Sequence, residues 1–311
     1  MSKINRVLIT GAGGMLGSAV VPYFKGKGLT VLSTSRRKNS EVVDEVLDVD
    51  DFEVYSSYTN KFKPDIILHL AAETDLELCE KNPDRAYTTN TIGAQNGAVL
   101  AIQCDIPIVE ISSAGIFDGT KIDPYKDFDT PAPINVYGNS KWQGEKYITN
   151  HCPKYFIARA GWMVGGGAKD KKFVSHIVNQ IIDGKTELFG LTDKLGAPTF
   201  APDFASNLFE LVQTPFYGTY NMVCEGNISR FDILEEIVKM LQLEDRIKVT
   251  KVSGDYFDDQ FFAPRPRSEV LENYLLRLRN LNRMRDWKTA LTPYVQELYA
   301  SRSKDKTAHS K

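Results

Sequence analysis

Short apolar, β-branched runs alternate with helix-length patterns through the first half of the chain. The apolar runs predict strands at residues 4–9, 30–33, 42–47, 65–70, 107–111 and 155–159. The stretches between them predict helices near residues 14–27, 51–62, 83–103 and 135–151. Because the strand candidates are apolar throughout, we expect them to be buried on both faces, as in a parallel sheet. The alternation therefore predicts an α/β fold with a doubly wound parallel sheet of the Rossmann type.

The pattern changes after about residue 162, where strands become fewer and "GGGAKD" interrupts the chain. We expect residues 1–162 to form the sheet domain, to which segments near 191–223 return. Residues 163–300 should form mainly a smaller α/β lobe that shapes a ligand pocket over the sheet. The tail, 301–311, is short and polar without an apolar period, and is expected to be disordered.

The second half of the chain contains patterns that predict individual helices and their N-caps. A helix is expected near 171–183, and the last one from about 289 to 300. Asp203 and Ser229 are interpreted as N-caps, and Ser229 with Asp232 resembles a weak capping box.

Composition narrows the classes of function. The 311 residues are 42% hydrophobic and 25% charged, which is typical of a soluble globular protein, and the net charge of −2 gives no field that favours nucleic acid or anionic membranes. The four cysteines show no disulfide or metal-ligand spacing, which indicates reduced thiols in a cytoplasmic protein. No apolar run approaches the roughly 20 residues of a membrane helix, glycines break the faint signal-peptide pattern at the start, and nothing requires a metal.

The stretch "VLITGAGGMLGSAV" places three glycines between the first predicted strand and the first predicted helix. Gly11 permits a tight turn, Gly14 lets the backbone approach a pyrophosphate, and Gly17 allows close packing of helix on sheet. The N–H groups and the dipole at the helix start then favour phosphate. The spacing and its strand–helix context predict a dinucleotide site.

The end of the second predicted strand bears on which dinucleotide binds. "LSTSRRKNS" lacks the acidic residue that an NAD site needs for the ribose 2′-hydroxyl, and offers Arg36 and Arg37 instead. An arginine there can pair with the 2′-phosphate of NADP, so the sequence favours NADP(H) and still allows NAD(H). We expect contacts to the cofactor from Gly11, Gly14, Met15, Leu16, Ser35, Arg36, Asp48, Val49, Ala71, Ala72, Thr74, Tyr137 and Lys141.

Candidate chemistry lies in "INVYGNSKWQGEKY", where Tyr137 and Lys141 are four residues apart and so share one helix face. A free tyrosine has a pKa near 10, and a nearby ammonium favours the phenolate and lowers that pKa. Ser112 and Ser113 end the fifth predicted strand, where open α/β sheets bind ligands. A hydroxyl there could bind the same substrate oxygen as the tyrosine. Together with the dinucleotide site, these residues predict a catalytic site that exchanges a proton with a substrate oxygen.

These residues resemble a known family. The glycine triplet, the YxxxK pair and the upstream serine are similar to the extended short-chain dehydrogenases/reductases. "AAETDLELCEKNPDRAYTTN", "GIFDG", "NVYGNSKWQGE", "GAPT", "RPRSEVL" and "NRMRDW", spread from Thr10 to Trp287, resemble the dTDP-4-dehydrorhamnose reductase family. The resemblance implies reduction of the C4 ketone of a 6-deoxy-hexulose attached to a nucleotide diphosphate. It implies that hydride comes from NADPH, and it assigns Tyr137 as proton donor, Lys141 as its partner and Ser113 as the second hydroxyl. Substrate contacts are then expected from Ser113, Ala114, Trp162 and Arg265.

The sequence departs from that family where the sugar should bind. The usual Asp and Tyr after the strand-end serine are Ala114 and Gly115, and Glu269 stands where the family has Ser. A site that hydrogen-bonds a hydroxyl discriminates strongly, so these changes predict an altered sugar preference with the reductive machinery intact.

Two other functions remain open. An epimerase/reductase needs an acid/base pair such as Cys and His beside the sugar, but Gly115 occupies the cysteine's place. His176 could face the pocket, whereas His69 lies in a buried strand pattern and is interpreted as a core histidine. The second alternative is a non-catalytic dinucleotide-binding regulatory subunit. The nucleotide, the sugar and the C4 stereochemistry are not determined, and neither is the oligomeric state, for which a homodimer is one option.

Overall fold

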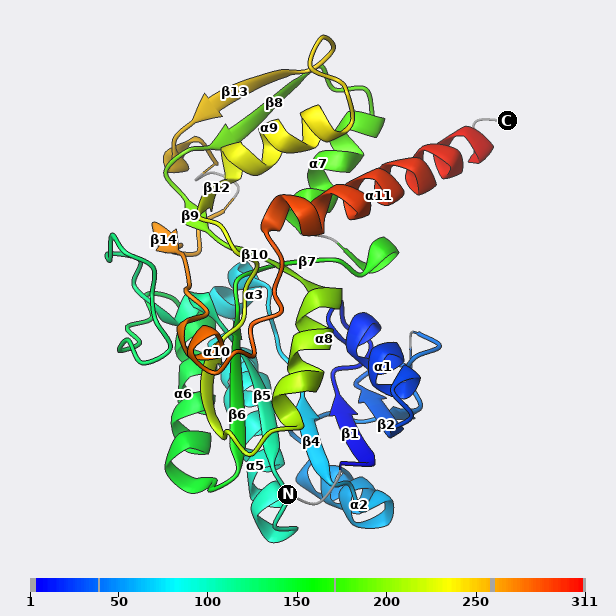
Figure 1. Cartoon of the computed structure of the whole chain (residues 1–311), viewed down its shortest axis with the longest axis vertical. Coiled ribbons are helices and arrows are strands. Elements are labelled where there is room, and N and C mark those ends of the chain that lie inside the picture. The colour runs from blue at the N-terminus through cyan, green and yellow to red at the C-terminus, as the bar shows by residue number, and fades with distance from the viewer. Residues whose placement is uncertain (1–3, 39, 171, 258–260, 310–311) are drawn as a thin grey trace.

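A seven-stranded parallel sheet forms the centre of the larger part of the molecule (Figure 1). The computed structural model describes residues 4–38, 40–170, 172–257 and 261–309. The strand order is β11-β6-β5-β4-β1-β2-β3, so the order reverses between β1 and β4. The strands are β1 (Arg6–Thr10), β2 (Thr30–Ser35), β3 (Glu45–Val46), β4 (Ile66–His69), β5 (Ile108–Ser113), β6 (Tyr155–Ala160) and β11 (Gly218–Asn221). This parallel topology confirms the predicted doubly wound fold, and its reversal point is where such sheets bind ligands.

Helices cover both faces of this sheet, because successive strand residues point to opposite sides. Val7 and Ile9 of β1 pack into one core cluster, and Leu8 between them packs into another. The first cluster includes residues of α1 (Gly17–Gly26) and α8 (Ala201–Val212), which contact each other; the second includes residues of α2 (Phe52–Phe62), α5 (Gly93–Gln103) and α6 (Val136–His151). Burial on both faces explains the apolar runs of β1, β4, β5 and β6, whereas both residues of the edge strand β3 are exposed.

The predicted helix over 83–103 is three elements: α4 (Pro83–Tyr87), the π-helical turn η1 (Thr88–Ile92) and α5. A further short helix, α3 (Leu76–Lys81), precedes them, and its N-cap Asp75 accepts a hydrogen bond from the Leu78 amide. These segments follow β4 and carry the chain along the edge of the ligand cleft described below.

The smaller lobe consists of short paired strands and helices above the carboxyl edge of the sheet (Figure 1). Strands β8 and β13 pair in parallel, and β12, β9 and β14 form a second small sheet. The strands are β7 (Trp162–Val164), β8 (Glu187–Leu191), β9 (Leu195–Gly196), β10 (Pro198–Phe200), β12 (Ile228–Ser229), β13 (Lys248–Val252) and β14 (Ser268–Glu269). The helices and single turns of this lobe are η3 (Gly167–Lys169), α7 (Phe173–Ile182), α9 (Arg230–Met240), η4 (Gly254–Phe257) and α11 (Trp287–His309). Two short elements pack on the larger part instead: η2 (Ala114–Ile116) contacts α6, and α10 (Tyr274–Leu278) contacts β11. None of the helices in the described ranges has the length and apolar character that a bilayer crossing requires.

Two local predictions for this half have opposite outcomes. The Ser229–Asp232 capping box is present and starts α9. Asp203 is not an N-cap: it lies in the first turn of α8, whose N-cap is Phe200. Both carboxylate oxygens of Asp203 instead accept hydrogen bonds from Arg285. Asp203 therefore forms an ion pair with a residue 82 positions later in the chain and does not cap the helix.

The tail differs from the expected disorder, since α11 continues to His309 and only residues 310–311 of it lie outside the described ranges. Arg302 anchors the extension on α7 by donating to Ser175 Oγ at 2.7 Å and Asn179 Oδ1 at 2.6 Å. These polar contacts carry no apolar period, which is why the sequence pattern missed the helix.

Candidate active site

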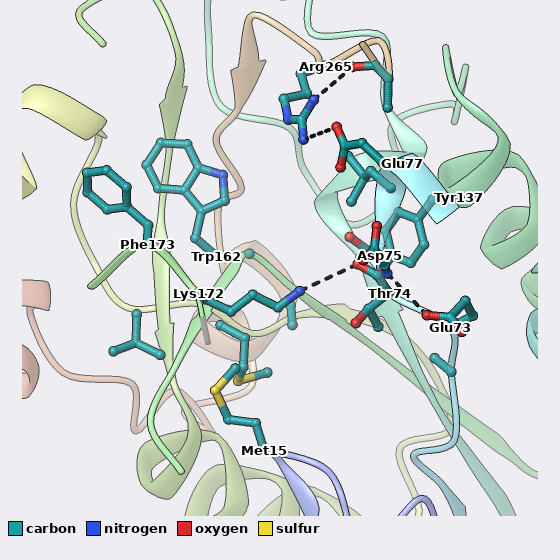
Figure 2. Close-up of a pocket in the computed structure, with 18 of the residues that line it drawn as sticks. Met15, Glu73, Thr74, Asp75, Glu77, Tyr137, Trp162, Lys172, Phe173 and Arg265 are labelled. Atoms are coloured by element: carbon teal, nitrogen blue, oxygen red, sulfur yellow. Dashed lines mark hydrogen bonds and ion pairs between the residues drawn. The ribbon is translucent and has the colours of Figure 1, made fainter. Parts of the chain in front are cut away.

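One cleft of about 1780 Å³ runs along the carboxyl edge of the sheet and beneath the smaller lobe. That volume exceeds the roughly 300–1,000 Å³ of a pocket for one small ligand, so there is room for two. In Figure 2, Trp162 and Phe173 form one wall and Tyr137 with the segment after β4 forms the other. Lys172 reaches across, with its Nζ 3.4 Å from the Thr74 carbonyl oxygen.

The cleft brings together nearly all residues predicted for the site from distant parts of the chain. Ala114 is the exception: it is 1% exposed and packs in an apolar cluster with Ile116, Phe117 and Leu271. The expectation that Ala114 touches substrate is therefore wrong, because the 3-10 turn η2 directs it into the core. Those lining the cleft are Gly11, Gly14, Met15, Leu16, Ser35, Arg36, Asp48, Val49, Ala71, Ala72, Thr74, Ser113, Tyr137, Lys141, Trp162 and Arg265.

The turn after β1 fits a dinucleotide phosphate. Gly11 has φ +66°, and a Cβ there would lie 2.5 Å from the Ala71 backbone nitrogen, so only glycine suits this close approach of the turn after β1 to the chain after β4. At Gly14 a Cβ would have a single neighbour, the Gly11 carbonyl oxygen at 3.3 Å, which leaves the approach open. Among the described residues no side chain caps α1, and the amides of Ser18 and Ala19 already donate to the carbonyl oxygens of Gly14 and Leu16. An anion at this helix start would therefore be favoured by the helix dipole. The buried Ser112 hydroxyl, also on the cleft, has no partner among the described residues.

The end of β2 carries the charges that would meet an adenine ribose. Arg36 is exposed and lines the cleft together with Ser35. Burial and the neighbouring Asp50 raise the pKa of Asp48, and the positive charge of Arg36 opposes that shift. A cation and an acid thus lie next to each other where the predicted 2′-phosphate would bind.

The residues predicted to react come together where the start of α6 packs on the turn after β5. Asn135 caps α6 by accepting from the Gly138 amide at 2.7 Å and donates to the Pro264 carbonyl oxygen at 2.8 Å. The Ser113 hydroxyl accepts from the Gly115 amide at 3.0 Å. Tyr137 therefore lies over Gly115 and beside Ser113.

The pKa of Tyr137 has opposing contributions. Burial raises it, while the Lys141 ammonium and a hydrogen bond with Ser113 lower it; Glu269 and Cys79 raise it further. The net shift is upward, since burial exceeds the effect of Lys141. Lys141 lowers the pKa of Tyr137, as predicted. In the free protein this effect is smaller than that of burial, so the pKa of Tyr137 lies above its ordinary value.

Lys141 has a partner that the sequence reasoning missed. Its ammonium forms an ion pair with Glu110, which lies in the middle of β5 and is 0% exposed. Burial raises the pKa of Glu110 to about 7, against the effect of Lys141. The signal was a carboxylate within the apolar run at 106–111, because an acid buried in a strand needs a partner. His69, the cross-strand neighbour of Glu110, is a core histidine as predicted, with Nδ1 3.2 Å from Thr10 Oγ1.

The wall of the cleft opposite Tyr137 centres on Trp162. The indole Nε1 donates to Glu269 Oε2 at 2.7 Å, and the Arg230 guanidinium lies 3.7 Å from the ring centroid. Burial lowers the pKa of Arg230 to about 10, so it stays charged at neutral pH. Arg265 pairs with Glu77 at 2.7 Å. Arg230 escaped the sequence analysis, since only the fold brings the start of α9 to this tryptophan. His176 lines the cleft from an exposed position on α7.

A phosphate cradle at the reversal point of a doubly wound sheet, with a Tyr–Lys pair and a strand-end serine further along one cleft, is the arrangement of a short-chain dehydrogenase/reductase. The fold and the site thus define an NAD(P)-dependent oxidoreductase.

Comparison with known proteins specifies the family. The profile of the RmlD substrate binding domain family matches residues 5–300, and the chain belongs to this family. It is 30% identical over 297 residues to dTDP-4-dehydrorhamnose reductase of Aggregatibacter actinomycetemcomitans, covering 92% of this chain and 97% of the relative. The solved dTDP-4-dehydrorhamnose reductase of Yersinia enterocolitica matches with TM-score 0.84 and 36% identity, over 95% and 99% of the two chains. That of Bacillus anthracis, in complex with NADP, matches with TM-score 0.86 and 29% identity, over 95% and 100%.

Proposed function

We propose that this protein reduces the C4 ketone of a 4-keto-6-deoxy sugar linked to a nucleotide diphosphate, with NADPH as reductant. The observation that carries the proposal is the meeting of Ser113, Tyr137 and Lys141 in one cleft with the glycine turn. The names of the relatives support the substrate class, and the NADP complex of the Bacillus anthracis enzyme supports the cofactor.

The roles of the residues follow from their placement. NADPH, when bound, supplies the hydride. Tyr137 gives its hydroxyl proton to the oxygen of the reduced carbonyl, and Ser113 hydrogen-bonds the same oxygen. The Lys141 ammonium favours the phenolate that Tyr137 becomes. Lys141 is buried and Ser113 and Tyr137 are partly buried, which strengthens each of these electrostatic effects.

The wall of the cleft opposite Tyr137 carries positive charges that suit the diphosphate of such a substrate. Arg230 and Lys172 line the cleft beside Trp162, and both can face a diphosphate. Glu269 holds the indole and adds a carboxylate where the family resemblance leads to a serine. Gly115 does not line the cleft itself, but a Cβ there would lie 3.4 Å from Ser113 Oγ and 3.5 Å from the Tyr137 ring, so a side chain at this position would reach the site. Its absence and the added carboxylate of Glu269 support a sugar preference that differs from that of the relatives.

The test is a panel of 4-keto-6-deoxy sugar nucleotides with dTDP, UDP, GDP and CDP, each assayed with NADPH and NADH, followed by product stereochemistry. Turnover of at least one member is expected. Cofactor binding without turnover, together with co-purification of a partner enzyme, would instead support the regulatory subunit.

Replacing Arg36 by alanine is expected to raise KM for NADPH about 10-fold to 100-fold and to leave KM for NADH nearly unchanged. A charge-assisted hydrogen bond contributes about 1.5–3 kcal/mol, and about 1.4 kcal/mol corresponds to tenfold in affinity. Lys38→Ala is the matched control, because Lys38 is exposed in the same basic segment but does not line the cleft. Equal losses for both cofactors in the Arg36 variant would contradict a 2′-phosphate contact.

A further inference from the structure

The buried ion pair beneath the reacting tyrosine joins two elements of the larger domain. Lys141 of α6 is 1% exposed and Glu110 of β5 is 0% exposed, and the lysine Nζ contacts Glu110 Oε1. Lys141 also lines the cleft beside Tyr137, whose pKa its charge lowers. Glu110, which is not among the residues that line the cleft, thus contacts the lysine that accompanies Tyr137.

Other charged groups near Glu110 do not take over this role. Glu145, also on α6, is held by Arg159 of β6 through hydrogen bonds of 3.0 and 2.7 Å. Tyr55 of α2 stays neutral, since burial and Glu110 raise the pKa of its hydroxyl. His69 of β4 stays neutral as well, because burial and Lys141 lower its pKa to about 3. Of the charged and titratable groups facing Glu110 in the described ranges, Lys141 is therefore the one that compensates the carboxylate.

Three buried polar atoms around this pair have no partner among the described residues: Glu110 Oε2, His69 Nε2 and the Tyr55 hydroxyl. A carboxylate with one unsatisfied oxygen in a buried place is costly in its charged form. The unsatisfied oxygen and burial therefore favour the protonated form of Glu110, while the Lys141 ammonium favours the ionised form; burial prevails and raises the pKa of Glu110 to about 7.

We propose that Glu110 is a positioning residue that sets the charge Lys141 presents to Tyr137, cancelling the ammonium when ionised and leaving it uncompensated when protonated. The role in turnover rests on the proposed function. When Glu110 is neutral, Tyr137 faces a full cation and donates its proton more readily. As pH rises through about 7, Glu110 ionises, the field of Lys141 is cancelled and proton donation becomes harder.

Glu110→Gln separates charge from position, because glutamine keeps an oxygen that accepts from Lys141 and has the same length. The direct readout is the tyrosinate absorbance of the free protein against pH, with the signal of Tyr137 isolated by subtracting the same variant carrying Tyr137→Phe. In the glutamine variant we expect the pKa of Tyr137 to fall by roughly one unit or more. Glu145→Gln is the matched control: it also breaks a buried ion pair of α6, and should leave that titration in place. An unchanged Tyr137 titration in Glu110→Gln overturns the proposal.

Turnover gives the second readout. In the wild type, kcat for ketone reduction should fall as pH rises through about 7, and in Glu110→Gln this inflection should disappear. In Glu145→Gln the inflection should persist at a lower pH, because the charge of Glu145 helps to raise the pKa of Glu110. If no Glu110 variant folds, a wild-type kcat that stays level through this range still contradicts the proposal. Absence of wild-type turnover with every sugar nucleotide contradicts the proposed function alone, because the absorbance titration needs no substrate.

Discussion

Tyr137→Phe is expected to lower kcat for ketone reduction by about 10²–10⁴-fold, the range that a positioned proton donor contributes. The substitution removes only the hydroxyl, and the ring keeps its place over Gly115 at the start of α6. Since the phosphate turn after β1 is untouched, the dissociation constant for NADPH should change little. Steady-state assays of NADPH oxidation and a fluorescence titration of the cofactor measure the two quantities.

Ser113→Ala is the comparison for that experiment, because it removes the other hydroxyl that is proposed to bind the same substrate oxygen. The Ser113 hydroxyl also accepts from the Gly115 amide, so its loss affects the turn as well as the reacting oxygen. We expect a smaller fall in kcat than in Tyr137→Phe, since the proton donor remains. Full activity in Tyr137→Phe would exclude this tyrosine as the proton donor and with it the proposed mechanism.

The sheet could be predicted from the sequence because the pattern that specifies it, an apolar run followed by a helix-length stretch, is local and repeats along the chain. Most buried strands are apolar runs that alternate with helix-length stretches, so β1, β2, β4, β5 and β6 follow from periodicity. The edge strand β3 is shorter than the predicted 42–47, and both of its residues are exposed. The smaller lobe has no such signal, since β9, β12 and β14 are two residues long. The last turns of α11 were missed because their contacts to α7 are polar.

The residues of the candidate site also differ in whether the local sequence predicts their contacts. Tyr137 and Lys141 share a helix and a motif, so their relation could be inferred from spacing. The pairs Glu110–Lys141 and Trp162–Glu269 join residues 31 and 107 positions apart, and nothing in the local pattern links them. Ala114 was misplaced for a related reason, because the direction of a side chain in a turn depends on the backbone of that turn.

Gly138→Ala is expected to lower kcat by about 100-fold although the new methyl group touches no ligand. A Cβ at Gly138 would lie 2.0 Å from the Gly115 carbonyl oxygen, and real Cβ atoms essentially never approach within 3.0 Å, so α6 or the turn must move by about 1 Å. That shift separates Tyr137 from Ser113, and a misplacement of about 1 Å can cost about 10²-fold in rate. Overpacking of this kind costs about 1–3 kcal/mol in free energy of unfolding, more than the roughly 1 kcal/mol that alanine gains over glycine in a helix.

Gly26→Ala provides the comparison, because a Cβ at this helical glycine would meet no atom within 4 Å. It should leave kcat and Tm unchanged or slightly raise Tm, whereas Gly138→Ala should lower both. The Gly138 amide is also the group that Asn135 caps, so a shift there loosens the start of the helix that carries Tyr137 and Lys141. NADPH affinity should fall far less than kcat, since the glycine turn after β1 lies on other elements. A Gly138 variant with normal kcat would mean that the contact of α6 with the Gly115 turn does not hold the tyrosine in its reactive position.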